Sequence, residues 1–289
     1  MITIILILLF VFSVLSVPVC HGVISGLYLF GLKVFPGLFI SFILTNMLVR
    51  ILQYRSINNP WILVAAGLMT GFPNGAYICS WYHKNNPESR LADMLAGIIN
   101  IPSPAFLISY VYINILEKCI SLPVFLMLTY IPVILCACTV ILLSGDRTKK
   151  NVKAPSMKND RKQIFHFFEE AVDSSINTAL KLGTYIILFS VIVSIVTYFL
   201  KDNTAGLAIT YSLEISNGLA IIKAAGLPEH ILILMTVLLD AFGGICIVMQ
   251  TRSICGHYIS IKKYIYQKLV LCIVTLVTAM LLIYVLNVL

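Results

Sequence analysis

The chain has 289 residues, of which 60% are hydrophobic and only 11% are charged, and its mean hydropathy is +0.97. These values exclude a water-soluble globular domain, because about 25% of the residues in such domains are charged. The formal net charge of +8 would favour a nucleic-acid partner in a soluble protein. Here most of that excess lies in one short segment, so no nucleic-acid partner is expected.

Four apolar runs contain no charged side chain and are long enough, at about 17 to 25 residues, to cross a hydrocarbon core of about 30 Å. The runs are residues 2–20, 124–144, 184–200 and 269–289. Each run is continuous, whereas membrane strands alternate over about ten residues. The sequence therefore predicts an all-α, polytopic integral membrane protein.

The first run has no Lys or Arg ahead of it and no small-x-small cleavage site before His21, so we expect residues 1–21 to form a retained transmembrane helix. Residues 17–20 read VPVC and lack the small residue of a lipoprotein site, so Cys20 should be unmodified. The eight cysteines include no CxxC pair. We expect no metal site, no disulfide framework and no cofactor.

Residues 145–163 form a basic linker with seven Lys or Arg residues against two Asp residues. Basic loops between spans stay on the cytoplasmic side, so this linker predicts the orientation of the chain. A solvated linker is the simplest interpretation, and a patch for lipid headgroups or nucleic acid is the alternative.

Features before the linker recur after it at offsets of 141 to 148 residues. The corresponding pairs are Lys33 and Lys181, Asn74-Gly75 and Asn217-Gly218, the Pro102–Pro104 and Gly243-Gly244 breaks, and the runs 124–144 and 269–289. We predict two membrane repeats, residues 22–144 and 164–289, and interpret them as inverted. A chance pairing of Gly and Pro breaks is the alternative, since both residues are common in membrane helices.

The second repeat begins with an amphipathic segment, residues 164–181, in which charged residues alternate with apolar ones at helical spacing. We expect it to lie along the membrane surface. Its counterpart, residues 26–39, contains three glycines and a proline and should be less regular. Lys33 and Lys181 either attract an anion or extend to the interface.

Helix breaks carry the candidate site. GFPNGA at residues 71–76 lies between two apolar half-helices, and a broken helix exposes backbone N–H groups and a partial positive charge that favour an anion. A plain hinge is the alternative. IPSPAFLI at residues 101–108 has too few residues on either side for a full crossing, so we expect a re-entrant hairpin there, and Gly243-Gly244 should be its counterpart.

The polar and glycine residues at these breaks are the expected solute-binding set. They are Thr70, Gly71, Asn74, Gly75, Asn100, Ser103, Glu214, Ser216, Asn217, Gly218, Gly243, Gly244 and Gln250. Glu214 and Asp240 lie in apolar sequence, where acids are costly, and are candidates for coupling to H⁺ or Na⁺. Pairing of Glu214 with Lys223 or Arg252, and helix capping by Asp240, are the alternatives.

Four motifs together resemble the sporulation integral membrane protein YlbJ family, whose repeats are of the nucleoside-recognition "Gate" type. The motifs are GLMTGFPNGAYICSWY, PSPAF, SLEISNGLA and AFGGICIVMQ, and the resemblance spans about residues 31–268. It implies a spore-forming bacterial source, a transporter-like fold of inverted repeats, and a role in cortex formation and in the passage of dipicolinic acid into the forespore.

We therefore expect a multi-pass protein of the bacterial cell membrane or forespore membrane that transports a small, anionic solute. The alternatives are a nucleoside transporter and a membrane scaffold for spore assembly, and a homo-oligomer remains open. No nucleophile and base pair, HExxH or paired-Asp motif is present, so we expect no enzyme and no catalytic residue.

Overall fold

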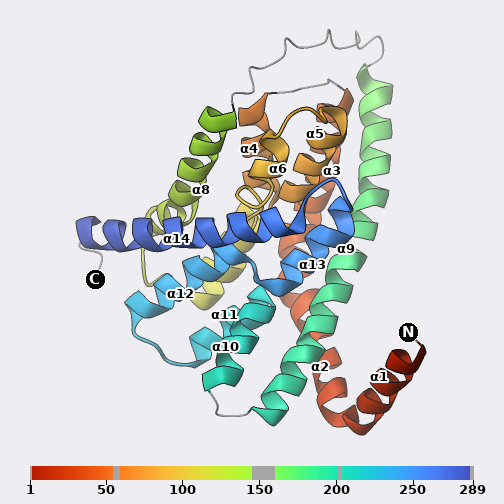
Figure 1. Cartoon of the computed structure of the whole chain (residues 1–289), viewed down its shortest axis with the longest axis vertical. Coiled ribbons are helices and arrows are strands. Elements are labelled where there is room, and N and C mark those ends of the chain that lie inside the picture. The colour runs from red at the N-terminus through yellow and green to blue at the C-terminus, as the bar shows by residue number, and fades with distance from the viewer. Residues whose placement is uncertain (1, 55–58, 145–159, 201–203, 287–289) are drawn as a thin grey trace.

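The computed structural model describes residues 2–54, 59–144, 160–200 and 204–286, and within these ranges the chain forms helices and no strand (Figure 1). The first half contains α1 Ile2–Val14, α2 Ser16–Tyr28, the π-helix η1 Leu29–Val34, α3 Phe35–Tyr54, α4 Pro60–Thr70, α5 Asn74–Asn85, α6 Leu91–Leu95, α7 Pro104–Phe106, the π-helix η2 Leu107–Ile115 and α8 Leu122–Ser144. The second half contains α9 Asp160–Phe199, α10 Thr204–Leu213, α11 Ile215–Ala224, α12 Glu229–Phe242, α13 Gly244–Cys255 and α14 Ile261–Leu286.

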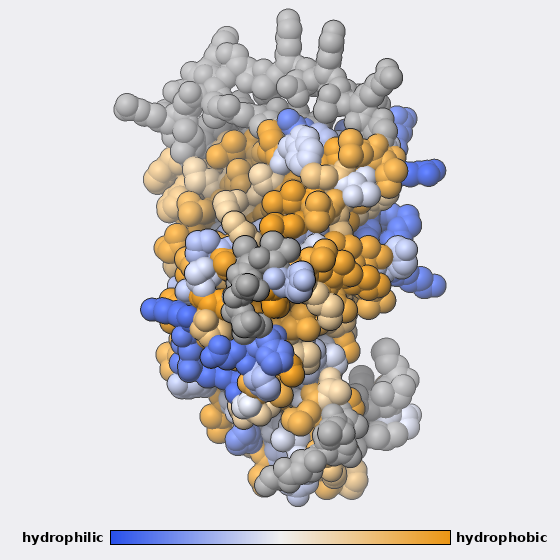
Figure 2. Space-filling view, turned by 90° about the vertical axis from the view of Figure 1, so that its left-hand side faces the viewer, coloured by the Kyte–Doolittle hydropathy of each residue, from blue (hydrophilic) through white to orange (hydrophobic). Residues whose placement is uncertain are grey.

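Five helical segments are long and apolar enough to cross a membrane, which agrees with the predicted all-α, multi-pass architecture. They are Ser16–Val34, Leu122–Ser144, Phe165–Phe199, Glu229–Cys255 and Ile261–Tyr284. Figure 2 shows a face covered largely by hydrophobic side chains, and large apolar residues on α8 and α14 are exposed. An apolar surface of this extent suits a lipid environment.

The helices α2 and α3 of the first half pack against α9 in antiparallel fashion. Arg50 of α3 pairs with Glu170 near the start of α9, whereas Gly22 of α2 contacts α9 at Val191, near its end. A Cβ atom at Gly22 would lie 2.5 Å from the Val191 Cα, and one at Gly26 would lie 2.7 Å from the Ile187 Cα. The glycines therefore bring the two backbones into direct contact.

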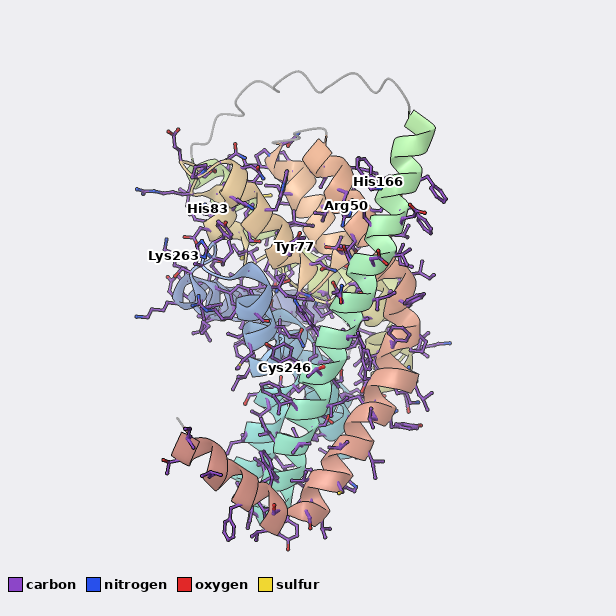
Figure 3. All side chains as sticks on the ribbon, turned by 90° about the vertical axis from the view of Figure 1, so that its right-hand side faces the viewer. Arg50, Tyr77, His83, His166, Cys246 and Lys263 are labelled. Carbon is purple, nitrogen blue, oxygen red and sulfur yellow. The ribbon has the colours of Figure 1, made fainter. Side chains whose placement is uncertain are left out.

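Two helical hairpins enter the molecule from opposite ends of α9. α4 follows the end of α3, which lies beside the start of α9, and α10 follows the end of α9. α4 packs against α5, and α10 packs against α11, so the chain turns back at residues 71–73 and at Glu214. Figure 3 shows α5 running outward from Tyr77 to His83. The tips of both hairpins thus lie toward the middle of the molecule.

The prediction of a re-entrant hairpin at residues 101–108 is wrong, because the chain does not fold back on itself there. No comparable packing joins α6 to α7, or α12 to α13, within the described part of the chain, and Glu229–Cys255 reads as one broken span. The reversals occur at the Asn-Gly segments instead. A tight reversal needs small residues between its arms, and Gly218 of α11 provides this, since a Cβ there would lie 2.5 Å from the Tyr211 carbonyl oxygen of α10.

Two further expectations change. The apolar run 2–20 is divided at Leu15 between α1 and α2, so a candidate span begins at Ser16 and residue 21 is no boundary. Residues 164–181 form no separate surface helix, because α9 continues through them without a break and packs against α3, where Glu170 pairs with Arg50. Residues 26–39 are less regular, as expected, since they contain η1. Most of the predicted linker, residues 145–159, lies outside the described residues.

Candidate functional site

The four breaks meet at the centre of the molecule. Gly71, at a φ of 71°, lies against Ser103, because an added Cβ would be 2.4 Å from the Ser103 backbone nitrogen. Gly243 lies against Phe72, and a Cβ there would be 3.1 Å from the Phe72 ring. Gly244 lies against the Leu213 carbonyl. The glycines are therefore needed for the close approach of one break to another.

Asn100 holds the first hairpin tip to the rest of the protein. Its side chain is fully buried, and its Oδ1 accepts a hydrogen bond of 3.2 Å from the backbone N–H of Ala76, in the first turn of α5. Its Nδ2 donates to the Tyr264 hydroxyl at 2.8 Å and to Thr251 at 3.3 Å. Asn100 thus links α5, α13 and α14, and its hydrogen-bonding groups are used within the protein.

Lys268 of α14 is fully buried between the two halves. Its Nζ donates to the backbone carbonyls of Asn100 and, at 2.9 Å, of Ala241. It also lies 5.5 Å from the centre of the Phe72 ring, within cation–π range. One amine therefore connects the first broken span, the first hairpin tip and the last turn of α12.

Glu214 is the hinge residue of the second hairpin and the N-cap of α11. Its Oε2 accepts hydrogen bonds from the Asn217 backbone N–H at 2.8 Å and from Asn217 Nδ2 at 3.1 Å. Asn217 Nδ2 also donates to Ser190 of α9 at 3.0 Å. No ion pair of Glu214 with Lys223 or Arg252 is found among the described residues, since Lys223 pairs with Glu117.

The half-helix N–H groups that were expected to hold an anion are in part occupied by the protein. Ala76 donates to Asn100, Asn217 donates to Glu214, and the Phe106 N–H donates to Ser103 Oγ at 3.3 Å. Side chains from the breaks thus cap all three helix starts. In this conformation, contacts with a solute fall to cavity-lining side chains.

Three cavities lie one after another along α9. The first, of about 350 Å³, is lined mainly by polar residues of α3, α5 and α9, and Figure 3 places Arg50 and Tyr77 in this region. Its lining includes Asn46, Arg50, Asn74, Tyr77, Ser174, Asn177, Thr178 and Lys181. The Nδ2 atom of Asn74 is buried and has no hydrogen-bond partner among the described residues. Volumes of 300 to 1,000 Å³ are usual for small-molecule sites.

The second cavity lies at the meeting point of the breaks and is small, with a volume of about 30 Å³. Its polar lining residues are Ser103, Glu214, Ser216 and Gln250, and Phe72, Leu182 and Ile186 are among the apolar ones. This volume accommodates about one water molecule. The space at the meeting point of the breaks, called the constriction below, is therefore too small for a solute.

The third cavity, of about 410 Å³, lies beyond the constriction between α2, the last third of α9 and Asn217. The α9 residues that line the three cavities run from Ser174 through Leu182 and Ile186 to Tyr198. At 1.5 Å per residue, this length of helix is about 36 Å, close to the thickness of a hydrocarbon core.

The sequence-predicted residues divide among these places. Ser103, Glu214, Ser216 and Gln250 line the constriction, Asn74 the first cavity and Asn217 the third. The five predicted glycines, Gly71, Gly75, Gly218, Gly243 and Gly244, provide close backbone approaches. Among the described residues, Thr70 hydrogen-bonds within its own helix, to the Gly67 carbonyl, and Asn100 is structural. Asp240 is buried away from the lining of all three cavities.

Sequence reasoning missed Lys268, Arg50 and Ser190. Lys268 immediately precedes the charge-free run 269–289 and reads as a flanking residue, but α14 begins at Ile261, so Lys268 lies two turns inside it. The helical continuity of KKYIYQK with that run was the available signal.

No known family, no curated protein and no solved structure matches this chain.

Proposed function

We propose that this protein is a membrane transporter for a small, anionic solute. The observation that carries the proposal is the row of cavities along α9, in which two larger chambers flank a constriction built by four helix breaks. Discontinuous helices that meet near the membrane midplane are typical of secondary transporters. The conformation corresponds to a closed state, because the constriction is too small for a solute.

The charge of the first cavity favours an anion. Lys181 lines it without an ion-pair partner among the described residues, and Arg50 lines it while paired with Glu170. Asn74, whose buried Nδ2 atom has no hydrogen-bond partner among the described residues, also lines this cavity. Glu214 at the constriction opposes an anion, so passage requires its charge to be neutralised by a proton or a cation. The family resemblance supplies dipicolinate as the solute, and hence a role at the forespore membrane.

The entry of the two hairpins from opposite ends of α9 supports inverted repeats. The order of hairpin, broken span and final helix is the same in both halves. The final helices differ, since α14 crosses the bundle in Figure 1 whereas α8 runs more nearly along it. We therefore propose the inverted relation for the long helices, hairpins and broken spans.

Uptake into proteoliposomes tests the function. We expect radiolabelled dipicolinate to accumulate in preference to a neutral nucleoside. Lys181→Gln should raise the KM for dipicolinate by about tenfold, since one charge-assisted contact is lost. The matched control is Lys33→Gln, because Lys33 is exposed at the corresponding position of the first half and lines none of the three cavities.

Preference for the nucleoside would contradict an anionic solute. Equal loss of uptake in Lys181→Gln and Lys33→Gln would contradict the assignment of the first cavity. Absence of any uptake, with protein that is folded by circular dichroism, would contradict transport itself.

A further inference from the structure

A second group of polar residues lies away from the three cavities, between α12 and α8. Thr236 and Asp240 are one helical turn apart on α12, so their side chains share a face, and both are fully buried. Among the described residues, neither oxygen of the Asp240 carboxylate has a hydrogen-bond partner, and neither does the Thr236 hydroxyl.

Tyr130 of α8 completes the group. α8 packs against α12, and Tyr130 packs against the hydrophobic cluster that contains Val237 and Leu239, close to Asp240 on α12. The Tyr130 hydroxyl is also buried and without a hydrogen-bond partner in the described structure. Tyr211 provides a contrast, because it packs against the same cluster but its hydroxyl donates to the Met235 carbonyl at 2.7 Å.

Four buried oxygen atoms on two packed helices thus have no hydrogen-bond partner among the described residues. Buried polar groups of native proteins are almost always paired, since leaving one unpaired costs about 1 to 3 kcal/mol. A protonated Asp240 would satisfy itself by donating to a neighbouring hydroxyl, and no such hydrogen bond is present. A hard cation between these atoms would satisfy all four at once.

The position on α12 also favours a cation. Asp240 lies in the last turn of a half-helix that ends at Gly243, where the helix dipole is negative. C-terminal ends of broken helices coordinate Na⁺ in transporters. Lys268, the buried lysine of α14, directs its amine to the Asn100 and Ala241 carbonyls, and neither Asp240 oxygen has a partner among the described residues.

We propose that Asp240, Thr236 and Tyr130 form a sodium-ion site. Binding of Na⁺ stands on this geometry alone, whereas its role as the ion that drives uptake rests on the proposed function. The bound ion would stabilise the end of α12 and, through Gly243, the approach of the second broken span to Phe72.

Thermal unfolding of the purified protein in detergent tests the binding. Na⁺ should raise the Tm by about 2 to 5 °C in a saturable manner at constant ionic strength, with choline as the replacement cation. Choline, and K⁺ at equal concentration, should produce a smaller shift. Equal shifts with all three cations would overturn the proposal.

Isosteric variants identify the ligands. Asp240→Asn should abolish the Na⁺-dependent shift, and Thr236→Val and Tyr130→Phe should each raise the Na⁺ concentration at half-maximal shift by about tenfold. Tyr211→Phe is the matched control and should leave that concentration unchanged, because the Tyr211 hydroxyl is already bonded to the backbone. A retained shift in Asp240→Asn, or equal effects in the two tyrosine variants, would contradict the site.

The two proposals fail in different ways. Uptake that proceeds equally in choline and in Na⁺ would leave transport standing and remove the coupling role of Na⁺. A Na⁺-dependent Tm without any uptake would leave the ion site standing and remove the transport function.

Discussion

The two hairpin tips are held in place by different chemistry. At the first tip, Gly71 lies against Ser103, and the neutral side chain of Asn100 caps the start of α5 from a distant part of the chain. At the second tip, an acid of the tip itself, Glu214, caps the start of α11. The second half also contributes the buried Asp240 and Lys268.

The first tip is built from uncharged residues, whereas the second half contributes the buried ionisable residues. The residues of the first tip itself contribute glycines and neutral hydrogen bonds, which fix geometry, whereas the charged contact of Lys268 with Phe72 comes from the second half. The second half carries the ionisable groups, which can respond to a proton or a cation. If transport is coupled to an ion, its response should therefore reside in the second half.

The largest expected effect comes from alanine at the first tip. Gly71→Ala adds a Cβ 2.4 Å from the Ser103 backbone at a positive φ, and should lower the free energy of unfolding by about 3 to 5 kcal/mol. Gly244→Ala, at a φ of 82°, approaches the Leu213 carbonyl only to 3.2 Å and should cost about 1 to 2 kcal/mol. Denaturation in detergent measures both. A larger loss in Gly244→Ala would reverse the comparison.

An intermediate effect is expected where the two halves are joined. Lys268→Ala leaves the Asn100 and Ala241 carbonyls unpaired and opens a cavity, and should cost about 2 to 4 kcal/mol. Lys263→Ala, on the same helix, removes an exposed ion pair with Asp93 and should change the Tm much less. Similar Tm values for the two variants would show that Lys268 does not join the halves.

The smallest effect on stability should come from removing the charge of Glu214 at the second tip, compared with removing the Asn100 side chain at the first. Asn100→Ala leaves the Ala76 N–H and the Tyr264 hydroxyl unpaired and should cost about 1 to 3 kcal/mol. Glu214→Gln keeps a cap oxygen for Asn217 and should cost less than about 1 kcal/mol while changing the pH dependence of uptake. Unaltered pH dependence in Glu214→Gln would place the proton-sensitive group elsewhere.

Local patterns in the sequence predict the all-α membrane architecture and the places where helices break. Proline and glycine act on their own neighbours, so the interruptions near Gly71, Pro102 and Gly243 could be located in advance. Apolar runs likewise predict spans, because length and composition alone decide whether a segment suits the hydrocarbon core.

Long-range pairing could not be predicted in the same way. The chain reverses at Glu214 rather than at Gly243 because α10 and α11 fit against each other through Gly218, which is a property of two surfaces. Asn100 finds its partners more than 150 residues away, at Thr251 and Tyr264. Lys268 reads as an interfacial lysine until its carbonyl partners are known.

The contact of α2 with α9 has a consequence for how the protein could change shape. At Gly22 and Gly26 the backbones of α2 and α9 are in direct contact, so we expect the two helices to move as one rigid unit. Residues of this unit form one wall of each of the three cavities. If a solute crosses the constriction, α2 and α9 would stay fixed, and the hairpins and broken spans on the opposite side would move relative to them.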